Sequence, residues 1–498
     1  MSKIQNFING KLVDAEASEY TPVYNPATGQ PIAQCPMTTV AQVDEAVKGA
    51  DNAFKSWSQT PVIQRTQVMF KLRELLLENL DELATMLSTE HGKTHADAKA
   101  EIGRGIEVVE FACGMPHHLK GDISVELAKG VDAFNIRQPL GVCAGITPFN
   151  FPGMIPLWMA PIAIAAGNTF VLKPAEADPS LPLRIAVLWQ QAGLPDGVLQ
   201  VVNGGKTVVE RFIEHPDIAA ISFVGSSKVA EIVYQGGTAH GKRVQALGAA
   251  KNHAIVMPDA DLAFTVNHIV GAAFGAAGER CMALPQVVCI GDSVADKLVA
   301  MVKAKMQDLH VGAYDDEKAD LGPLYSKSHQ QKVNEYIHIG VEEDQAELIV
   351  DGRHLTVPGY ENGFFVGPTL FDHVKEGMVI HNDEIFGPVL GVMRVSSYDD
   401  AVAVINRHPF GNGAVIFTTN GGIARQFVLD IKAGMVGINV PIPAPSALYS
   451  FGGWKSSIFA EHHMYGEEGV RFFTRFKVTT ARWPDSASGS QSALVMPT

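Results

Sequence analysis

One cysteine of this sequence stands where a thiol can act as a nucleophile. Cys281 follows the Gly- and Ala-rich stretch AAFGAAGER and precedes the strand-like run QVVCI. We expect backbone N–H groups and the adjacent Arg280 cation to favour its thiolate, the reactive form of cysteine. The alternative interpretation is a small buried residue, because free cysteines are usually buried. We adopt that alternative for the other four cysteines, Cys35, Cys113, Cys143 and Cys289.

Asn150 is a candidate hydrogen-bond donor to an oxyanion. It lies in ITPFNFPGMIP, where we expect a buried strand to end and a helix to begin. Thiolate attack on an aldehyde creates an oxyanion, and a side-chain amide can donate to it. Taken alone, however, Asn150 is better explained as the cap of a turn before Pro152.

Two further strand ends carry groups that suit a nucleotide. Lys173 and Glu176, in VLKPAEADP, can reach ribose hydroxyls at the carboxyl edge of a parallel sheet. Gly225 and Ser226, in ISFVGSSKVA, open a helix whose first N–H groups favour phosphate. The glycine pattern departs from G-x-G-x-x-G, so these residues alone are weak evidence for a nucleotide.

Strands that alternate with helices must position these residues. From residue 140 onward, the apolar runs GVCAGIT, NTFVL, GVLQVV and IAAISFV are separated by helical patterns at 154–166, 181–192 and 226–236. This alternation is typical of a parallel α/β sheet. A second α/β run begins near His253, with AIVM, QVVCI, AELIV and GAVIFTT as its strands.

The first part of the chain is predicted to be helical. Thr39-x-x-Gln42 is a capping-box pattern that opens one helix. Amphipathic patterns predict a second helix over about 61–87 and a third over about 96–114. A length of 498 residues favours two or three domains.

Composition and charge exclude several classes of partner. A net charge of −14 argues against nucleic acid and anionic membrane surfaces, and an anionic substrate then needs local arginines. Five cysteines without a CxxC motif favour a reducing compartment. The uncharged stretch between Arg137 and Lys173 is interrupted by prolines, so we expect a buried core segment rather than a membrane span. No signal peptide is expected at the N-terminus. No histidine or cysteine spacing predicts a metal site, so we expect none.

Six motifs together resemble those of the aldehyde dehydrogenase superfamily. PFNFP, KPAE, FVGS, GERC, EIFGPV and FGGWKSS occur in its order and approximate spacing, over nearly the whole chain. The resemblance implies an α/β fold that assembles as a homotetramer or homodimer. It implies a Rossmann-like NAD-binding domain, a catalytic α/β domain, a small β oligomerisation flap and a tail, at 1–118 with 139–249, 250–448, 119–138 with 464–483, and 484–498.

The resemblance also implies a role for each candidate residue. Cys281 resembles the nucleophile, and Asn150 resembles the oxyanion donor, which acts together with the Cys281 backbone N–H. A carboxylate at Glu176 would repel a 2′-phosphate, which favours NAD over NADP. The residues that resemble cofactor contacts are Lys173 and Glu176 for the adenosine ribose, Gly225 and Ser226 for the pyrophosphate, and Glu384 and Phe386 for the nicotinamide side.

One departure from the hydrolytic members is informative. These members carry E-L-G-G-K, whose glutamate activates the deacylating water, whereas this sequence has LGAAK with Leu247 in that place. Leucine cannot accept a proton, so we expect the thioester on Cys281 to wait for a thiol such as coenzyme A. This matches the acylating branch typified by methylmalonate-semialdehyde dehydrogenase, which the strings FACGMPHHLKGD, GAAFGAAGERCMAL, NVPIPAP and VMPT also resemble.

Two arginines resemble the substrate-carboxylate contacts of that branch. Arg280 precedes the nucleophile, and Arg104 lies in EIGRGIE, where a solvated helix arginine is the alternative interpretation. The predicted activity is NAD-dependent, CoA-acylating oxidation of malonate or methylmalonate semialdehyde to acetyl-CoA or propionyl-CoA, with loss of CO2. The alternatives are a hydrolytic aldehyde dehydrogenase and a catalytically silent relative. We expect a bacterial cytoplasmic protein, with the mitochondrial matrix as the other possibility.

Overall fold

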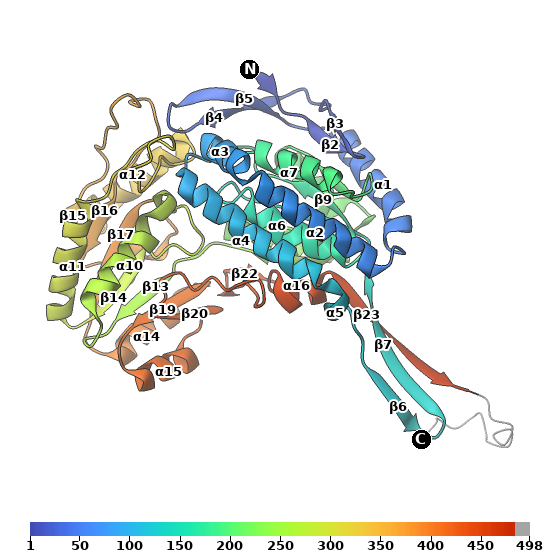
Figure 1. The fold of residues 1–498 in the computed structure, drawn as a ribbon. Coiled ribbons are helices and arrows are strands. Elements are labelled where there is room, and N and C mark those ends of the chain that lie inside the picture. The colour runs from blue at the N-terminus through green and yellow to red at the C-terminus, as the bar shows by residue number, and fades with distance from the viewer. Residues whose placement is uncertain (484–498) are drawn as a thin grey trace.

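Two large sheets form the body of the protein in this computed structural model, which describes residues 1–483 (Figure 1). The first sheet has the strand order β22-β12-β11-β8-β9-β10-β2-β3, and the second has the order β15-β16-β17-β14-β13-β19-β20. The expected tail, residues 484–498, lies outside the described residues. The alternation of strands and helices therefore correctly predicted an α/β fold. The domain boundaries stay a prediction.

The first sheet is parallel at its centre and antiparallel at both edges. Its central strands are buried on both faces, which explains their continuous apolar runs. In sheet order, the strands are β22 (Ile458–Phe459), β12 (Arg243–Leu247), β11 (Ile218–Val224), β8 (Val142–Ile146), β9 (Thr169–Lys173), β10 (Leu199–Val201), β2 (Asn6–Ile8) and β3 (Lys11–Val13).

Two sequence predictions for the early helices have different outcomes. The side chain of Thr39 accepts a hydrogen bond from the backbone N–H of Gln42, which confirms the predicted helix start. The single helix expected over 61–87 is wrong, because two helices meet at Asn79, whose side-chain amide donates to the carbonyl of Leu75. The helices of this part are α1 (Val40–Trp57), α2 (Val62–Glu78), α3 (Leu80–His91), α4 (His95–Cys113) and α5 (Met115–His118).

The uncharged stretch forms a buried helix between two strands. All twelve residues of α6 (Met154–Ala165) are buried, Pro161 included. The side chain of Asn168 accepts from the backbone N–H groups of Leu140 and Gly141 and so ties the following turn to β8. Among residues 1–483, no helix combines the length and the apolar character needed to cross a membrane. The remaining helices of this sheet are α7 (Ser180–Gln191), α8 (Lys206–Glu214) and α9 (Ser227–Ala239).

The second sheet is parallel except at β15, which pairs antiparallel with β16. Its strands are β13 (His253–Val256), β14 (Gln286–Ile290), β15 (Glu347–Val350), β16 (Thr369–Asp372), β17 (Val389–Val395), β19 (Gly413–Phe417) and β20 (Met435–Ile438). Its helices are α10 (Leu262–Phe274), α11 (Asp292–Met306), α12 (Lys327–Glu342), α13 (Val379–Asn382), α14 (Tyr398–Arg407) and α15 (Gly421–Asp430).

The register of the first sheet brings the candidate residues to one edge. Ile146 at the end of β8 pairs with Lys173 at the end of β9. On the other side, Ile146 pairs with Phe223 of β11, and Val224 pairs with Leu247 of β12. Because the central strands are parallel, the segments that follow them start from the same carboxyl edge, where α/β folds bind their ligands.

Three small sheets complete the described chain. β1 (Ser2–Lys3), β5 (Gln30–Pro36) and β4 (Tyr20–Asn25) pack near the N-terminus. β6 (Ile123–Ala128), β7 (Val131–Pro139) and β23 (Thr474–Arg482) form the flap, a ribbon that extends away from the body (Figure 1). The flap strands therefore come from both predicted segments, although the C-terminal one first forms α16 (Gly466–Phe472). β18 (Phe410–Gly411) pairs with β21 (Trp454–Lys455).

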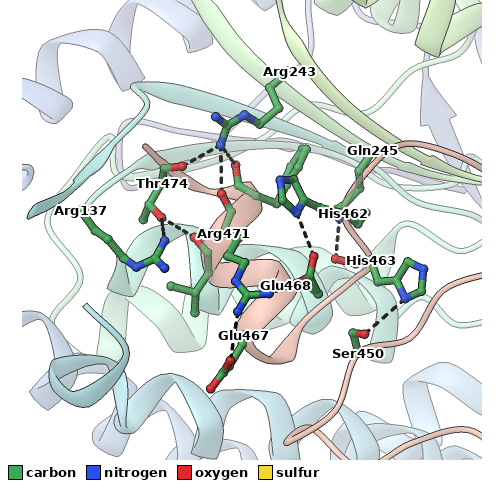
Figure 2. Close-up of polar contacts among 12 residues, drawn as sticks. Arg137, Arg243, Gln245, Ser450, His462, His463, Glu467, Glu468, Arg471 and Thr474 are labelled. Atoms are coloured by element: carbon green, nitrogen blue, oxygen red, sulfur yellow. Dashed lines mark hydrogen bonds and ion pairs between the residues drawn. The ribbon is translucent and has the colours of Figure 1, made fainter. Parts of the chain in front are cut away.

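Polar contacts from β12 hold the chain segment that leads into the flap (Figure 2). The guanidinium of Arg243 donates to the carbonyls of Arg471, Phe472 and Thr474 at the end of α16. The side chain of Gln245 donates to the carbonyls of His462 and His463. A cation at a helix C-terminus is favourable, so β12 fixes both α16 and the start of β23.

Candidate active site

A strained turn presents Cys281. Ala276, Ala277 and Gly278 have φ values of 49°, 51° and 75°. Residues other than glycine rarely adopt this left-handed backbone conformation. At Gly278 a Cβ would lie 2.3 Å from the carbonyl oxygen of Gly387, so only glycine fits there. Non-glycine residues in such conformations persist where the surrounding structure fixes them, typically at functional sites.

Two side-chain amides from the second sheet fix the nucleophile. Asn252 and Asn412 both donate to the backbone carbonyl of Cys281, at 3.0 and 3.1 Å. Asn252 also donates to the carbonyl of Ala283 and accepts from the N–H of Gly413. The Cys281 backbone is therefore tied to β13 and β19 directly before it enters β14.

Within the described residues, three cavities have Cys281 in their walls, and one of them, of about 20 Å³, is far smaller than the other two. A cavity of about 180 Å³ is lined by Arg104, Arg280, Trp158 and Phe451, among others. A larger cavity of about 380 Å³ also includes Cys281 in its wall. It is lined by Asn150, Gly225 and Ser226, which follow strands β8 and β11, and by Glu384 and Phe386, which lie between α13 and β17. The structure thus brings these distant positions together around one thiol.

The electrostatic setting of the thiol differs from the expectation. Burial, and then the Glu384 carboxylate, raise the pKa of Cys281 to about 12, while backbone N–H groups and Arg280 lower it less. Arg280 and the backbone N–H groups thus favour the thiolate, as expected, but burial and Glu384 outweigh them. Burial also raises the pKa of Glu384 to about 7, although that carboxylate accepts a hydrogen bond of 2.8 Å from the N–H of Ala250.

The larger cavity offers an anion-binding helix end. Ser226 is the residue that precedes α9, and its side chain makes no capping hydrogen bond within the described chain. The first N–H groups of this 13-residue helix are left without that cap, as phosphate binding at a helix start requires. Phe386, which also lines this cavity, has a φ of 59°, and its carbonyl lies 2.7 Å from Nε2 of His329.

Lys173 and Glu176 form a pair at the end of β9. The Lys173 ammonium lies 3.0 Å from the Glu176 carboxylate, with the lysine buried and the glutamate half-buried. Among the described residues that line the two cavities, neither of these is found. They occupy the same sheet edge as the larger cavity, through the pairing of Lys173 with Ile146.

Both arginines of the smaller cavity carry protein counterions. Arg280 donates to Asp97 at 2.6 Å, and Arg104 donates to both carboxylate oxygens of Glu107 at 2.9 and 2.8 Å. Arg104 also donates to the carbonyl of Pro445 at 2.6 Å. The Arg104 side chain is 38% exposed, so these contacts are compatible both with a solvated helix arginine and with a guanidinium that binds ligands at the cavity wall.

Leu247 is 2% exposed and belongs to the same apolar cluster that Cys281 packs against. An apolar side chain thus occupies the position at which the sequence comparison placed a catalytic glutamate.

A buried charged pair in contact with the Asn150 backbone was not among the residues predicted from the sequence. Lys93 and Glu101 are each 1% exposed, and the Lys93 ammonium lies 2.6 Å from the Glu101 carboxylate. A signal was present, because Glu101 lies on the same helix face as the apolar residues Ala98, Ile102 and Gly105. A carboxylate on a buried helix face needs a partner, and only the tertiary structure identifies it.

The chain is similar in sequence to known proteins over nearly its full length. The model of the aldehyde dehydrogenase family matches residues 12–479. A malonate-semialdehyde dehydrogenase of Pseudomonas aeruginosa is 50% identical over 497 residues, which is 100% of both chains. Malonate-semialdehyde dehydrogenase 1 of Geobacillus thermodenitrificans is 49% identical over 96% of this chain and 99% of its own.

Two solved structures are similar in fold. The crystal structure of methylmalonate-semialdehyde dehydrogenase from Oceanimonas doudoroffii has a TM-score of 0.96 and 50% identity, and the match covers 98% of this chain and 99% of that one. A Sinorhizobium meliloti structure assigned to the same enzyme class and complexed with NAD has a TM-score of 0.96 and 47% identity, with the same coverage.

The raised pKa of Cys281 predicts slow alkylation of the cofactor-free protein. Because only the thiolate reacts, the rate of iodoacetamide labelling of the Cys281 peptide should rise about tenfold per pH unit from pH 7 to 9, without a plateau. Removing the nearby negative charge in Glu384→Gln should lower the pKa and speed labelling at pH 8. Peptide mass spectrometry separates Cys281 from the other cysteines. A rate that is already constant above pH 7 would show that the thiolate is favoured instead.

Proposed function

The chain belongs to the aldehyde dehydrogenase family, and we propose that it is a malonate- and methylmalonate-semialdehyde dehydrogenase that transfers the acyl group to coenzyme A. The observation that carries this proposal is the position of Cys281 in the walls of both the smaller and the larger cavity, together with an apolar Leu247 in the place of the glutamate of the hydrolytic members. The names of the full-length relatives, at about 50% identity, support the same substrate class.

NAD fits the larger cavity and the adjoining sheet edge. The uncapped start of α9, at Gly225 and Ser226, suits the pyrophosphate. Lys173 and Glu176 would hold the adenosine ribose at the end of β9, and Glu384 and Phe386 the nicotinamide side. When bound there, NAD accepts the hydride of the oxidation.

The smaller cavity suits the carboxylate of the substrate. Arg104 and Arg280 both line it, and a planar guanidinium binds a carboxylate with two parallel hydrogen bonds. Their pairing with Glu107 and Asp97 keeps them in place before the substrate arrives. The aldehyde carbon of a 3-carbon semialdehyde acid then reaches Cys281 from the same cavity.

Cys281 and Asn150 have different roles in the reaction. The Cys281 sulfur attacks the aldehyde carbon, and the Asn150 amide donates to the oxyanion that forms. Loss of hydride leaves a thioester that carries a β-carboxylate. Loss of CO2 from this thioester, followed by protonation, gives an acetyl or propionyl group on Cys281. The thiol of coenzyme A then displaces the Cys281 sulfur and releases acetyl-CoA or propionyl-CoA.

The hydrolytic alternative requires a base near the thioester. Leu247 cannot activate water, because its side chain has no group that accepts a proton. We therefore place the chain in the acylating branch. The exposed apolar residues of β6, Ile123, Val125 and Leu127, support assembly through the flap into a homodimer or homotetramer. The relatives are bacterial, which supports a bacterial cytoplasmic enzyme.

Coenzyme A dependence tests the proposed function. With NAD and malonate semialdehyde, the purified protein should release about one NADH per Cys281 in a burst and then slow by about 10²-fold, because Leu247 replaces the glutamate that activates water in the hydrolytic members. Adding coenzyme A should restore sustained NADH formation, followed by absorbance. Steady turnover at the full rate without coenzyme A would assign the chain to the hydrolytic enzymes.

The arginine pair predicts a substrate-specific loss. Arg280→Ala or Arg104→Ala should lower kcat/KM for malonate semialdehyde by about 10- to 100-fold, the effect of losing a charge-assisted hydrogen bond. For propanal, which has no carboxylate, the change should stay within about threefold. Arg407→Ala, which removes an exposed pair with Glu376 remote from the cavities, is the control. Equal losses on both aldehydes would rule out carboxylate binding by these arginines.

A further inference from the structure

A buried ion pair lies directly behind the loop that carries Asn150. Lys93 lies between α3 and α4, and Glu101 lies on α4. Both side chains are 1% exposed, and their charged groups are 2.6 Å apart. Taking two charges out of water is unfavourable, and such pairs seldom stabilise a protein more than apolar residues of the same size. We therefore infer the role of this pair from the other contacts that Lys93 and Glu101 make.

The two side chains hold the two ends of one loop. The Lys93 ammonium donates to the backbone carbonyl of Asn150 at 2.7 Å. The second oxygen of the Glu101 carboxylate accepts from the N–H groups of Gly153 and Met154, at 2.8 and 3.1 Å. Those N–H groups start α6, whose preceding residue, Gly153, has no side chain to cap it. Glu101 thus caps α6 from another helix.

The clamped loop sets where the Asn150 amide points. One N–H of that amide donates to the carbonyl of Glu279 at 3.1 Å, two residues before the nucleophile. A side-chain amide has two N–H donors, so the second is available to the larger cavity that Asn150 and Cys281 share. An oxyanion donor is effective only when it is fixed before the reaction, since a shift of about 1 Å lowers the rate by about 10²-fold.

We propose that Lys93 and Glu101 are positioning residues of this enzyme, which fix the Asn150 amide for the oxyanion formed on attack by Cys281. The proposal rests on the role of Asn150 in the proposed function. Lys93 also lines the smaller cavity beside Arg104 and Arg280, so a direct contact with the substrate carboxylate is the competing role. A direct contact with the carboxylate would affect only substrates that carry one, whereas positioning of Asn150 would affect every aldehyde.

A double-mutant cycle tests the proposal. The readout is the rate of the NADH burst in a single turnover, for Lys93→Met, Asn150→Ala and the double variant, on malonate semialdehyde and on propanal. Asn150→Ala should slow the burst by about 10²- to 10³-fold. Lys93→Met should slow it by about 10- to 100-fold in the otherwise unchanged protein. In the Asn150→Ala background the same change should have less than about a threefold effect, because the two residues act through one group.

Two further variants separate positioning from folding. Glu101→Gln keeps the volume and the acceptor for Gly153, and it should slow the burst in the same direction, so it carries the test if Lys93→Met is insoluble. Lys242→Met is the matched control. Lys242 is also a buried lysine that donates to two backbone carbonyls, those of His215 and Ile218, and it lies outside the described lining of both cavities. It should lower the Tm without any coupling to Asn150.

Each contrary outcome has its own meaning. Equal effects of Lys93→Met with and without the Asn150 amide would overturn the positioning role. A loss confined to malonate semialdehyde, with propanal unchanged, would also overturn it and assign Lys93 to the substrate carboxylate. An unchanged burst in Asn150→Ala alone would instead contradict the role given to Asn150 in the proposed function, independently of Lys93.

Discussion

The Cys281 thiol is half-buried and lies in the walls of two cavities, on a segment that residues next to the second sheet hold in place. Burial raises its pKa to about 12, and the apolar side chain of Leu247 belongs to the cluster it packs against. These two features have different chemical consequences. Burial keeps the thiol protonated, and Leu247 offers no proton acceptor where the hydrolytic members carry their water-activating glutamate.

Residues from both sheets fix the backbone around this thiol. The left-handed run from Ala276 to Gly278 turns the chain sharply, and Asn252 and Asn412 then hold the carbonyl of Cys281. From the first sheet, the parallel register brings the segments after β8, β9 and β11 to one edge. The smaller and the larger cavity therefore both reach the same sulfur, the first past Arg104 and Arg280 and the second past Asn150 and Glu384.

The sequence correctly predicted those features of the fold that depend on residues close together in the chain. The start of α1 at Thr39 and the strand expected over NTFVL follow from capping and from an apolar run, and both are confirmed, the strand as β9. The break at Asn79 was missed, since its side chain competes with the helix only through a specific hydrogen bond. The charge state of Cys281 and the partner of Glu101 could not be predicted from spacing, because burial and pairing arise from elements that are distant in the sequence.

The lifetime of the acyl group on Cys281 tests this account most directly. After one turnover with NAD and methylmalonate semialdehyde but no coenzyme A, mass spectrometry of the Cys281 peptide should find a propionyl thioester that persists until coenzyme A is added. In Leu247→Glu the carboxylate should shorten that lifetime by providing a base for water. If the thioester in the unmodified protein instead disappears as fast as NADH forms, water reaches and attacks it, and the account of Leu247 is wrong.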